Sequence, residues 1–412
     1  MKGIQVMNIN AARLLQTIDT LGSRGITERG RCRLAASDED KAGRDYVVSL
    51  MKEAGLTVKV DKIGNIFGIW EDASNRGQKC VMTGSHVDSV INAGKYDGCL
   101  GTLGAIEVVR TLKENGYQPK RPIVIGAFTN EEGVRYQPDM MGSLVYVGGM
   151  ALADALSAVG TDGTTLGDEL TRIGYAGTEE PGFLQPEYFI ELHIEQGPIL
   201  DIEGISAGAV DTLQGISWQK VTITGKQNHA GTTPTYLRRD AGVAAAKVNL
   251  YLRQRAVTTG KTLATVGTIA FEPNAVNVIP SQATFTVDLR NPDCEALKEE
   301  EARLQDFLRE LKKSDGVTVE CEQLSRFDPV LFDEDIAALV EVSAKERGLS
   351  CRRITSGAGQ DAQMLVRICK TAMIFVPSVN GISHNPEEYT ADTDVENGAN
   401  VLLDAVRKLC EK

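Results

Sequence analysis

The stretch Pro122-Ile123-Val124-Ile125-Gly126-Ala127-Phe128-Thr129 decides the fold. It is apolar almost throughout and shorter than a typical helix, so it predicts a strand that is buried on both faces of a sheet. The chain then continues directly into Asn130-Glu131-Glu132-Gly133. The sequence therefore places a pair of acidic residues at the end of a buried strand.

Two other short apolar runs end in polar residues in the same way. Cys80–Thr83 leads to His86, and Tyr188–Leu192 leads to His193. Between these runs, the apolar residues of 102–112 recur at helical spacing. Strands that alternate with helices predict an α/β fold, with a mostly parallel sheet in the middle of three layers. Such sheets bind ligands at the carboxyl ends of their strands, so we expect these polar side chains to meet there.

The middle of the chain has a different pattern. The apolar periodicity predicts, in order, a strand around 221–224, a helix over 239–255, strands over 264–271 and 283–289, a helix over 297–311 and a strand at 317–319. The order β-α-β-β-α-β is that of a ferredoxin-like sandwich, which is complete in itself. We therefore predict a domain at 212–325 inserted into a first domain made of 1–211 and 326–412.

Composition excludes several classes of protein. The 412 residues carry 44 basic and 56 acidic side chains, a net charge of −12 that argues against a nucleic-acid partner. No segment has the apolar length of a membrane span, and Met1–Asn10 has no apolar core for a signal peptide. The eight cysteines include no CxxC pair. They are typical of reduced thiols, and predict a cytoplasmic protein.

All four histidines lie beside acidic, glycine or asparagine residues: His86, His193, His229 and His384. A single histidine is usually structural, but four in such surroundings favour a reaction centre. Imidazoles and carboxylates are the ligands that hold zinc or manganese while leaving a position open for water. The sequence therefore predicts a metal-dependent hydrolase.

Three acidic positions add to this interpretation. Asp97 lies in a glycine-flanked loop before a helix, where a carboxylate can bridge two cations. Neighbouring residues of an extended backbone point to opposite sides, so either Glu131 or Glu132 can bind metal while the other faces the substrate. Asp88, two residues after His86, can hold the imidazole in place as an outer carboxylate. A pair of metals would stabilise the charge that develops during hydrolysis.

Arg290 ends the amphipathic strand 283–289. A charge at this point is either a solvated strand end or a binding group. A planar guanidinium beside an amide such as Asn277 suits bidentate capture of a carboxylate, so we expect an acidic substrate.

Seven motifs together resemble one enzyme group: GSHVDSVINAGKYDGCLG, FTNEEG, ELHIEQGP, NHAGTTP, VNVIPSQATFTVDLR, SGAGQDAQ and GISHNP. They are similar to those of N-carbamoyl-amino-acid hydrolases, β-ureidopropionases and allantoate amidohydrolases, a branch of the dimetal aminoacylase/carboxypeptidase-type superfamily. The resemblance spans nearly the whole chain in the expected order. It implies a catalytic domain interrupted by a lid that also forms a homodimer.

The resemblance also implies site roles. Two divalent ions, zinc or manganese with cobalt or nickel as further options, would be bound by His86, Asp97, Glu132, His193 and His384, with Asp97 bridging. Glu131 would be the general base and then the general acid. His229 would act in the active site of the other subunit, where it would stabilise the oxyanion. The substrate contacts would be Gln196, Asn277 and Arg290.

His193 favours the branch that hydrolyses ureido groups, because the related peptidases usually have aspartate at that ligand position. The expected substrate is an N-carbamoyl α-amino acid or N-carbamoyl-β-alanine, with allantoate as the alternative and peptide or N-acyl cleavage as the less favoured one. A catalytically inactive binding protein would have lost a ligand or the base, and neither is lost. Gln360 departs from the pattern, which commonly has histidine there; glutamine forms hydrogen bonds but carries no titrating proton.

Overall fold

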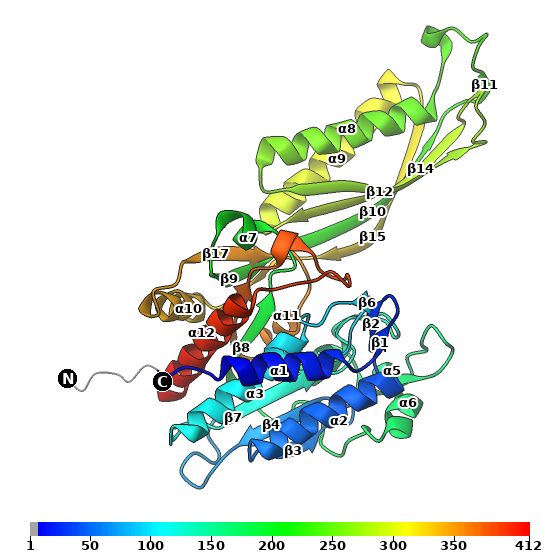
Figure 1. The fold of residues 1–412 in the computed structure, drawn as a ribbon. Helices are drawn as coiled ribbons and strands as arrows, with labels where there is room; N and C mark the ends of the chain where they lie inside the picture. Colours follow the sequence, from blue (N-terminus) through cyan, green and yellow to red (C-terminus); the bar gives the residue numbers. More distant parts are fainter. Residues whose placement is uncertain (1–6) are drawn as a thin grey trace. The chain divides into compact units, whose positions relative to one another are not determined.

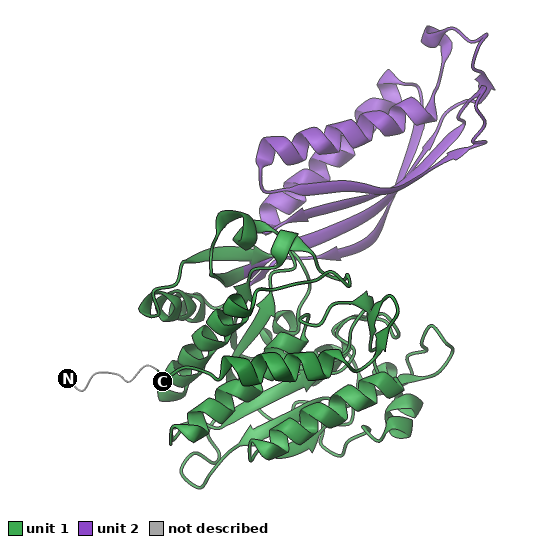
Figure 2. Ribbon diagram, viewed as in Figure 1, with its two compact units in different colours: residues 1–211, 332–412 green, residues 212–331 purple. Residues whose placement is uncertain are grey.

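The computed structural model describes residues 7–412, so part of the N-terminal stretch Met1–Asn10 lies outside the described residues. The chain divides into two compact units, one made of 1–211 and 332–412 and the other of 212–331 (Figure 2). The predicted boundary after residue 325 is too early, because strand β15 (Thr318–Phe327) continues through it.

The first unit contains most of a nine-stranded sheet, and four parallel strands form its centre (Figure 1). These strands are β18 (Lys370–Val376), β8 (Pro186–Ile194), β5 (Cys80–His86) and β7 (Ile123–Phe128), side by side in that order. The apolar stretch 122–129 therefore contains a buried strand of the parallel centre, as predicted.

Antiparallel strands flank this centre, so the expectation of a mostly parallel sheet needs correction to a mixed one. β4 (Ile66–Trp70) pairs antiparallel with β7, and β3 (Thr57–Val60) with β4. Beyond β18 lie β9 (Ala207–Leu213), its partner β17 (Cys351–Ser356), and β16 (Val330–Leu331). The loop 61–65 is too short for a parallel crossover, which forces β3 and β4 into a hairpin.

Helices cover both faces of this sheet. On one face α3 (Cys99–Glu114) and α12 (Asp392–Glu411) pack against the parallel strands and against each other, and α1 (Ala11–Gly22), α2 (Asp38–Glu53) and α10 (Glu334–Glu346) surround them. On the other face lie α4 (Met141–Tyr146) and α11 (Asp361–Leu365). The remaining short elements are α5 (Leu152–Leu156), α6 (Leu166–Ile173), α7 (Ile199–Glu203), η2 (Val379–Gly381) and the small sheet of β1 (Ile26–Thr27), β2 (Gly30–Cys32) and β6 (Ile91–Ala93).

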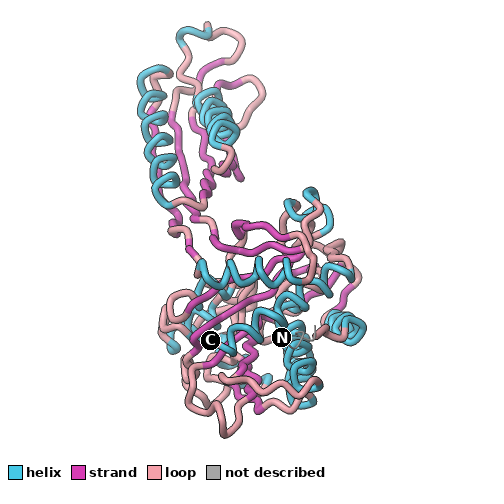
Figure 3. The backbone as a smooth tube through the Cα atoms, turned by 90° about the vertical axis from the view of Figure 1, so that its left-hand side faces the viewer, coloured by secondary structure: helices cyan, strands magenta, loops and turns pink. Residues whose placement is uncertain are grey.

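The main elements of the second unit follow the order β-α-β-β-α-β. Figure 3 shows the long helices of this unit beside its strands. Its elements are β10 (Gly215–Thr224), α8 (Ala241–Thr259), β12 (Leu263–Glu272), β14 (Gln282–Asn291), α9 (Cys294–Ser314) and β15. The sheet has the antiparallel order β12-β14-β10-β15, and both helices pack on one of its faces around a common apolar core. A separate ribbon of β11 (Asn228–His229) and β13 (Val278–Ile279) and the short helix η1 (Thr235–Leu237) complete the unit.

All eight cysteines are free. Among residues 7–412, no helix combines the length and the apolar character that crossing a membrane requires.

Candidate metal centre

The carboxyl ends of the central strands bring the predicted ligands of the first unit together. His86 is the last residue of β5, and His193 lies near the end of its neighbour β8. Glu132 follows β7 on the other side of β5, and His384 comes from the loop between β18 and α12. Parallel strands end at one edge of a sheet, which is why residues so distant in sequence can share one site.

Asp97 stands at the centre of two donor groups. Its Oδ1 atom lies 3.1 Å from His193 Nε2 and 3.6 Å from His86 Nε2. Its Oδ2 atom lies 3.3 Å from His384 Nε2, which is 3.5 Å from Glu132 Oε2. The two oxygens of one carboxylate thus face two different groups, His86–Asp97–His193 and Asp97–Glu132–His384.

This donor set fits a pair of divalent ions. Ligand atoms about 2.0–2.2 Å from one ion stand about 3–4 Å from one another. The four distances given above fall in this range, and within each group all donor atoms lie within 4.8 Å of one another. The Nδ1–H group of His86 meets the carbonyl of Asp88 at 3.0 Å, and that of His193 meets the carbonyl of Ile194 at 2.9 Å. These contacts leave each Nε2 atom turned toward Asp97, as metal-binding imidazoles require.

Gly98 keeps the backbone close to this centre. Its φ is +63°, and a Cβ atom there would lie 2.4 Å from the ring of His86. Any larger residue would therefore displace the imidazole. The Gly98 amide also donates to His193 Nε2 at 3.1 Å.

Asp88 is placed differently from the prediction. Its carbonyl, and not its carboxylate, accepts from His86; the carboxylate Oδ1 is 3.8 Å from the imidazole Nδ1. The two carboxylate oxygens instead accept from the backbone amides of Glu131 and Glu132, both at 3.2 Å. Asp88 therefore fixes the acidic pair at the end of β7 as well as the histidine at the end of β5.

The two members of the acidic pair have different surroundings, although they lie in a bend after β7 and not on the extended backbone that was expected. Glu132 belongs to a donor group, whereas Glu131 belongs to neither and places its Oε2 atom 3.5 Å from His86 Nε2. Burial raises the pKa of Glu131 well above its ordinary value, and raises the pKa of Glu132 to about 8. A carboxyl group perturbed in this way can hold a proton near neutral pH.

Protons on the imidazoles offset the negative charge of this centre. Burial would lower the pKa of His86, but the nearby Glu131 and a hydrogen bond with Asp97 raise it well above its ordinary value. A hydrogen bond with Asp97 raises the pKa of His384 to about 9. Burial would raise the pKa of Asp97, but its histidine partners hold it well below its ordinary value. Divalent cations would therefore compete with protons for the same nitrogen atoms.

Gln196, the predicted substrate contact, lies beside the same centre. Its Nε2 atom donates to Asp97 Oδ2 at 3.0 Å and lies 3.4 Å from His384 Nε2. Gln360, which stands where the family commonly has histidine, donates from its Nε2 atom to Gln196 Oε1 at 2.8 Å.

Several acids buried around this centre were not predicted, and Glu388 and Glu191 make hydrogen bonds that fix its loops. Glu388 accepts from the backbone amides of Tyr96 and Asp97, and so fixes the loop that carries the bridging carboxylate. Glu191 accepts from Ser85 Oγ at 2.6 Å and from the amide of Ala362. Glu191 could have been found as a charge inside an otherwise apolar strand, but Glu388 lies in a polar loop with no such signal.

The other predicted residues lie on the second unit. His229 and Asn277 are close together, because β11 pairs His229 with Val278 and the Ala230 amide donates to the Asn277 carbonyl. Arg290 lies near the end of β14, and its guanidinium contacts Asp288 at 2.9 Å.

Asn277 and Arg290 are far apart within one chain, contrary to the prediction that they grip one carboxylate together. β14 begins at Gln282, just after β13, and Arg290 is eight residues further along. Eight extended residues span about 26 Å. The β11–β13 ribbon lies beyond the end of the sheet at which β14 begins (Figure 1).

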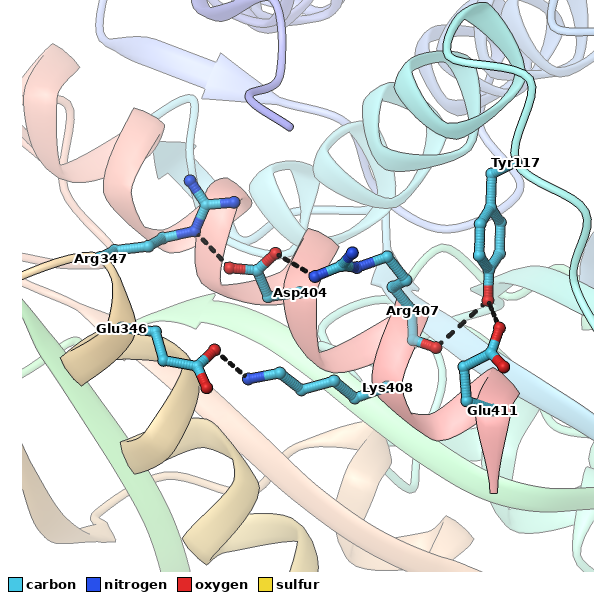
Figure 4. Close-up of a pocket in the computed structure, with 7 residues that line it drawn as sticks. All are labelled: Tyr117, Glu346, Arg347, Asp404, Arg407, Lys408 and Glu411. Atoms are coloured by element: carbon cyan, nitrogen blue, oxygen red, sulfur yellow. Dashed lines mark hydrogen bonds and ion pairs between the residues drawn. The ribbon is translucent and has the colours of Figure 1, made fainter. Parts of the chain in front are cut away.

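A surface pocket of about 630 Å³ lies elsewhere on the first unit, between α10 and α12 (Figure 4). Its charged groups pair with one another: Arg347 contacts Asp404 at 2.6 Å, and Lys408 contacts Glu346 at 2.6 Å. Tyr117 donates to Glu411 at 2.9 Å. We therefore interpret this pocket as part of a salt-bridged contact between the two helices.

Known proteins resemble this chain over nearly its whole length. An N-carbamoyl-L-amino-acid amidohydrolase from Rhizobium meliloti is 37% identical over 98% of this chain and 97% of its own. An allantoate amidohydrolase from Bacillus subtilis is 34% identical over 92% of this chain and 93% of its own. The crystal structure of a hydantoinase/carbamoylase family amidase from Burkholderia multivorans matches with a TM-score of 0.96 and 40% identity, covering 99% of this chain and 100% of that one.

The family model for peptidase family M20/M25/M40 matches residues 82–408, a range that includes every predicted ligand. The resemblance inferred from the motifs is confirmed, and the chain belongs to peptidase family M20/M25/M40.

Proposed function

We propose that this protein hydrolyses the ureido group of an N-carbamoyl amino acid, with water, to the free amino acid, carbon dioxide and ammonia. The observation that carries this proposal is the division of the Asp97 oxygens between two donor groups, with Glu131 beside them and outside both. The relative from Rhizobium meliloti, which bears this activity in its name, supports the choice of substrate.

Zinc or manganese ions held by the five donors would polarise the ureido carbonyl. Glu131 acts first as general base and then as general acid: it takes a proton from the attacking water and passes it to the departing nitrogen. Its buried position and raised pKa suit both steps. Gln196, whose side-chain amide donates to Asp97 at the edge of the donor set, would contact the polar end of the substrate.

Allantoate is the second candidate substrate, favoured by the relative from Bacillus subtilis. The test is ammonia release by metal-loaded protein from N-carbamoyl-α-amino acids, N-carbamoyl-β-alanine and allantoate, with dipeptides as the control. We expect an N-carbamoyl amino acid to give the highest kcat/KM. Faster turnover of allantoate would transfer the proposal to that substrate, and dipeptide cleavage without ammonia release would reject it.

We further propose that the second unit joins two chains in a homodimer. β12 is an edge strand of ten residues, and unpaired edges of that length are normally covered. α8, which packs beside it, exposes Val243, Leu250 and Val257, and Leu250 is 70% exposed. These residues are spaced by seven and therefore form one apolar stripe. A two-fold axis would pair the strand and the stripe with their own copies.

A dimer also resolves the separation of Asn277 from Arg290. Asn277 precedes β14, and Arg290 lies about 26 Å along that strand from its first residue, so one chain does not place both on one carboxylate. A two-fold axis would bring Asn277 of one chain to the carboxylate held by Arg290 of the other. His229 would arrive together with Asn277, because the β11–β13 ribbon holds both. The amides of Gly231 and Thr232 donate to His229 Nδ1, so its proton is on Nε2, where it can donate to an oxyanion.

We expect His229→Ala to lose about 10²–10³-fold in turnover and to retain its metal, because an oxyanion donor is removed. Mixed with Glu131→Ala chains, it should regain activity. Random exchange gives about half mixed dimers, each with one intact site, so roughly a quarter of parental activity returns.

Activity of the refolded mixture is measured, and subunit exchange is followed separately with a tagged chain. Each variant refolded alone is the control and should stay nearly inactive. If exchange is complete and activity does not return, His229 does not act on the neighbouring chain.

A further inference from the structure

The two glutamines beside the metal centre form a directed chain of hydrogen bonds. Gln360 Nε2 donates to Gln196 Oε1 at 2.8 Å, and Gln196 Nε2 donates to Asp97 Oδ2 at 3.0 Å. Gln360 is buried at the start of α11, and its side chain makes no capping hydrogen bond to that helix. Helix formation therefore does not account for a glutamine at this position.

The direction of this chain is set by Asp97. An ionised carboxylate only accepts hydrogen bonds, so Gln196 must turn its NH₂ group toward Asp97. Its carbonyl oxygen then points away from Asp97, toward the buried Gln360 side chain, and a partly buried carbonyl is more stable with a donor than without one. Gln360 supplies that donor.

The backbone of Gln196 is fixed independently. Its φ is +58°, a left-handed conformation that is uncommon outside glycine. Its amide donates to Ser378 Oγ at 3.0 Å. With the backbone held in this way, the freedom that remains is rotation of the side-chain amide, which decides whether a donor or an acceptor faces Asp97.

We propose that Gln360 is a positioning residue that fixes the amide orientation of Gln196, and thereby the donor presented at the Asp97–Glu132–His384 group. Of the measurements that test this inference, only the kinetic ones rest on the proposed function. Its first effect is on the metal, because hydrogen-bond partners of a ligating carboxylate tune metal affinity by about 10–100-fold.

Three substitutions separate the polarity of residue 360 from its size. Gln360→Met keeps the length and removes the donor; Gln360→Glu keeps the shape and offers only acceptors; Gln360→His keeps a donor. Gln363→Met is the matched control, since Gln363 lies on the same helix and outside the chain of hydrogen bonds. Zinc affinity of the stripped full-length proteins is measured by competition with a chromophoric chelator, and kcat and KM are measured on an N-carbamoyl amino acid.

We expect Gln360→Met to weaken zinc affinity and lower kcat/KM by about tenfold each, Gln360→Glu to lose more than Gln360→Met, and Gln360→His to stay within about threefold of the parent. Gln363→Met should match the parent. Parental zinc affinity in Gln360→Met, or a Gln360→Glu protein that is no worse than Gln360→Met, would overturn the proposal.

A double mutant tests whether a loss of zinc affinity in Gln360→Met comes from misfolding and not from the missing hydrogen bond to Gln196. If Gln360 acts through Gln196, then Gln196→Met with Gln360→Met should be no worse than Gln196→Met alone. Additive losses in zinc affinity would also overturn the proposal. If the parent releases no ammonia from any ureido acid, the proposed function fails, while the zinc measurements still decide the role of Gln360.

Discussion

Replacing Glu131 with glutamine is expected to lower kcat by about 10²–10⁴-fold, the usual contribution of general acid–base catalysis, and to leave metal content unchanged. The reason is geometric: Glu131 belongs to neither donor group, and its carboxylate is buried beside them. Glutamine keeps the shape of the side chain but cannot accept or deliver the proton. Turnover is measured on an N-carbamoyl amino acid, and bound metal by elemental analysis.

Glu132→Ala is the matched control, because it changes the neighbouring residue on the same backbone. Glu132 belongs to the group with Asp97 and His384, so this variant should lose bound metal. The amides of both glutamates donate to Asp88, and these backbone contacts can persist in either variant. Metal loss in Glu131→Gln, with full metal in Glu132→Ala, would reverse the two assignments.

Removal of the metal is expected to abolish activity altogether. A chelator should give an inactive protein, and zinc, manganese, cobalt or nickel should restore turnover, because both donor groups offer the nitrogen and oxygen ligands of such ions. Uptake should release protons and weaken as the pH falls, since the pKa of His384 is raised to about 9 by Asp97 and its imidazole must lose a proton to bind.

Elemental analysis and turnover are measured on the same preparation before and after chelation, with the magnesium-treated protein as the control for non-specific effects of a divalent ion. A fully active preparation without bound metal would contradict the assignment of both donor groups.

Much of the metal centre could be predicted because its residues occupy ends of buried strands. Short apolar runs before His86, Glu131 and His193 predict strands, and the alternation with helices predicts that they run parallel. Parallel strands have their carboxyl ends at one edge of the sheet, so the side chains that follow these strands are expected to meet at that edge. The same local periodicity predicted the order of elements in the second unit, because a helix and a strand bury their apolar faces at different spacings.

Orientation and long-range pairing were less predictable. The contact of His86 with the Asp88 carbonyl, and not its carboxylate, depends on a side-chain rotation that two residues of sequence do not specify. Asn277 precedes β13, before β14 begins, whereas Arg290 lies near the end of β14, so their separation depends on the length and direction of that strand. The hydrogen bond from Gln360 to Gln196 joins residues 164 positions apart in the sequence. The spacing of apolar residues along the chain does not predict such a contact.

The position of β18 in the large sheet determines how the chain can fold during synthesis on the ribosome. β18 lies between β8 and β9, yet it emerges only after the entire second unit has been made. The second unit has its own apolar core and can fold as it appears, whereas β8 and β9 must wait with unpaired edges. His384 follows β18, so the donor set is complete only after β18 has been made and has entered the sheet. A metal ion that needs His384 would therefore bind after this late strand has paired, and not while the earlier strands wait for it.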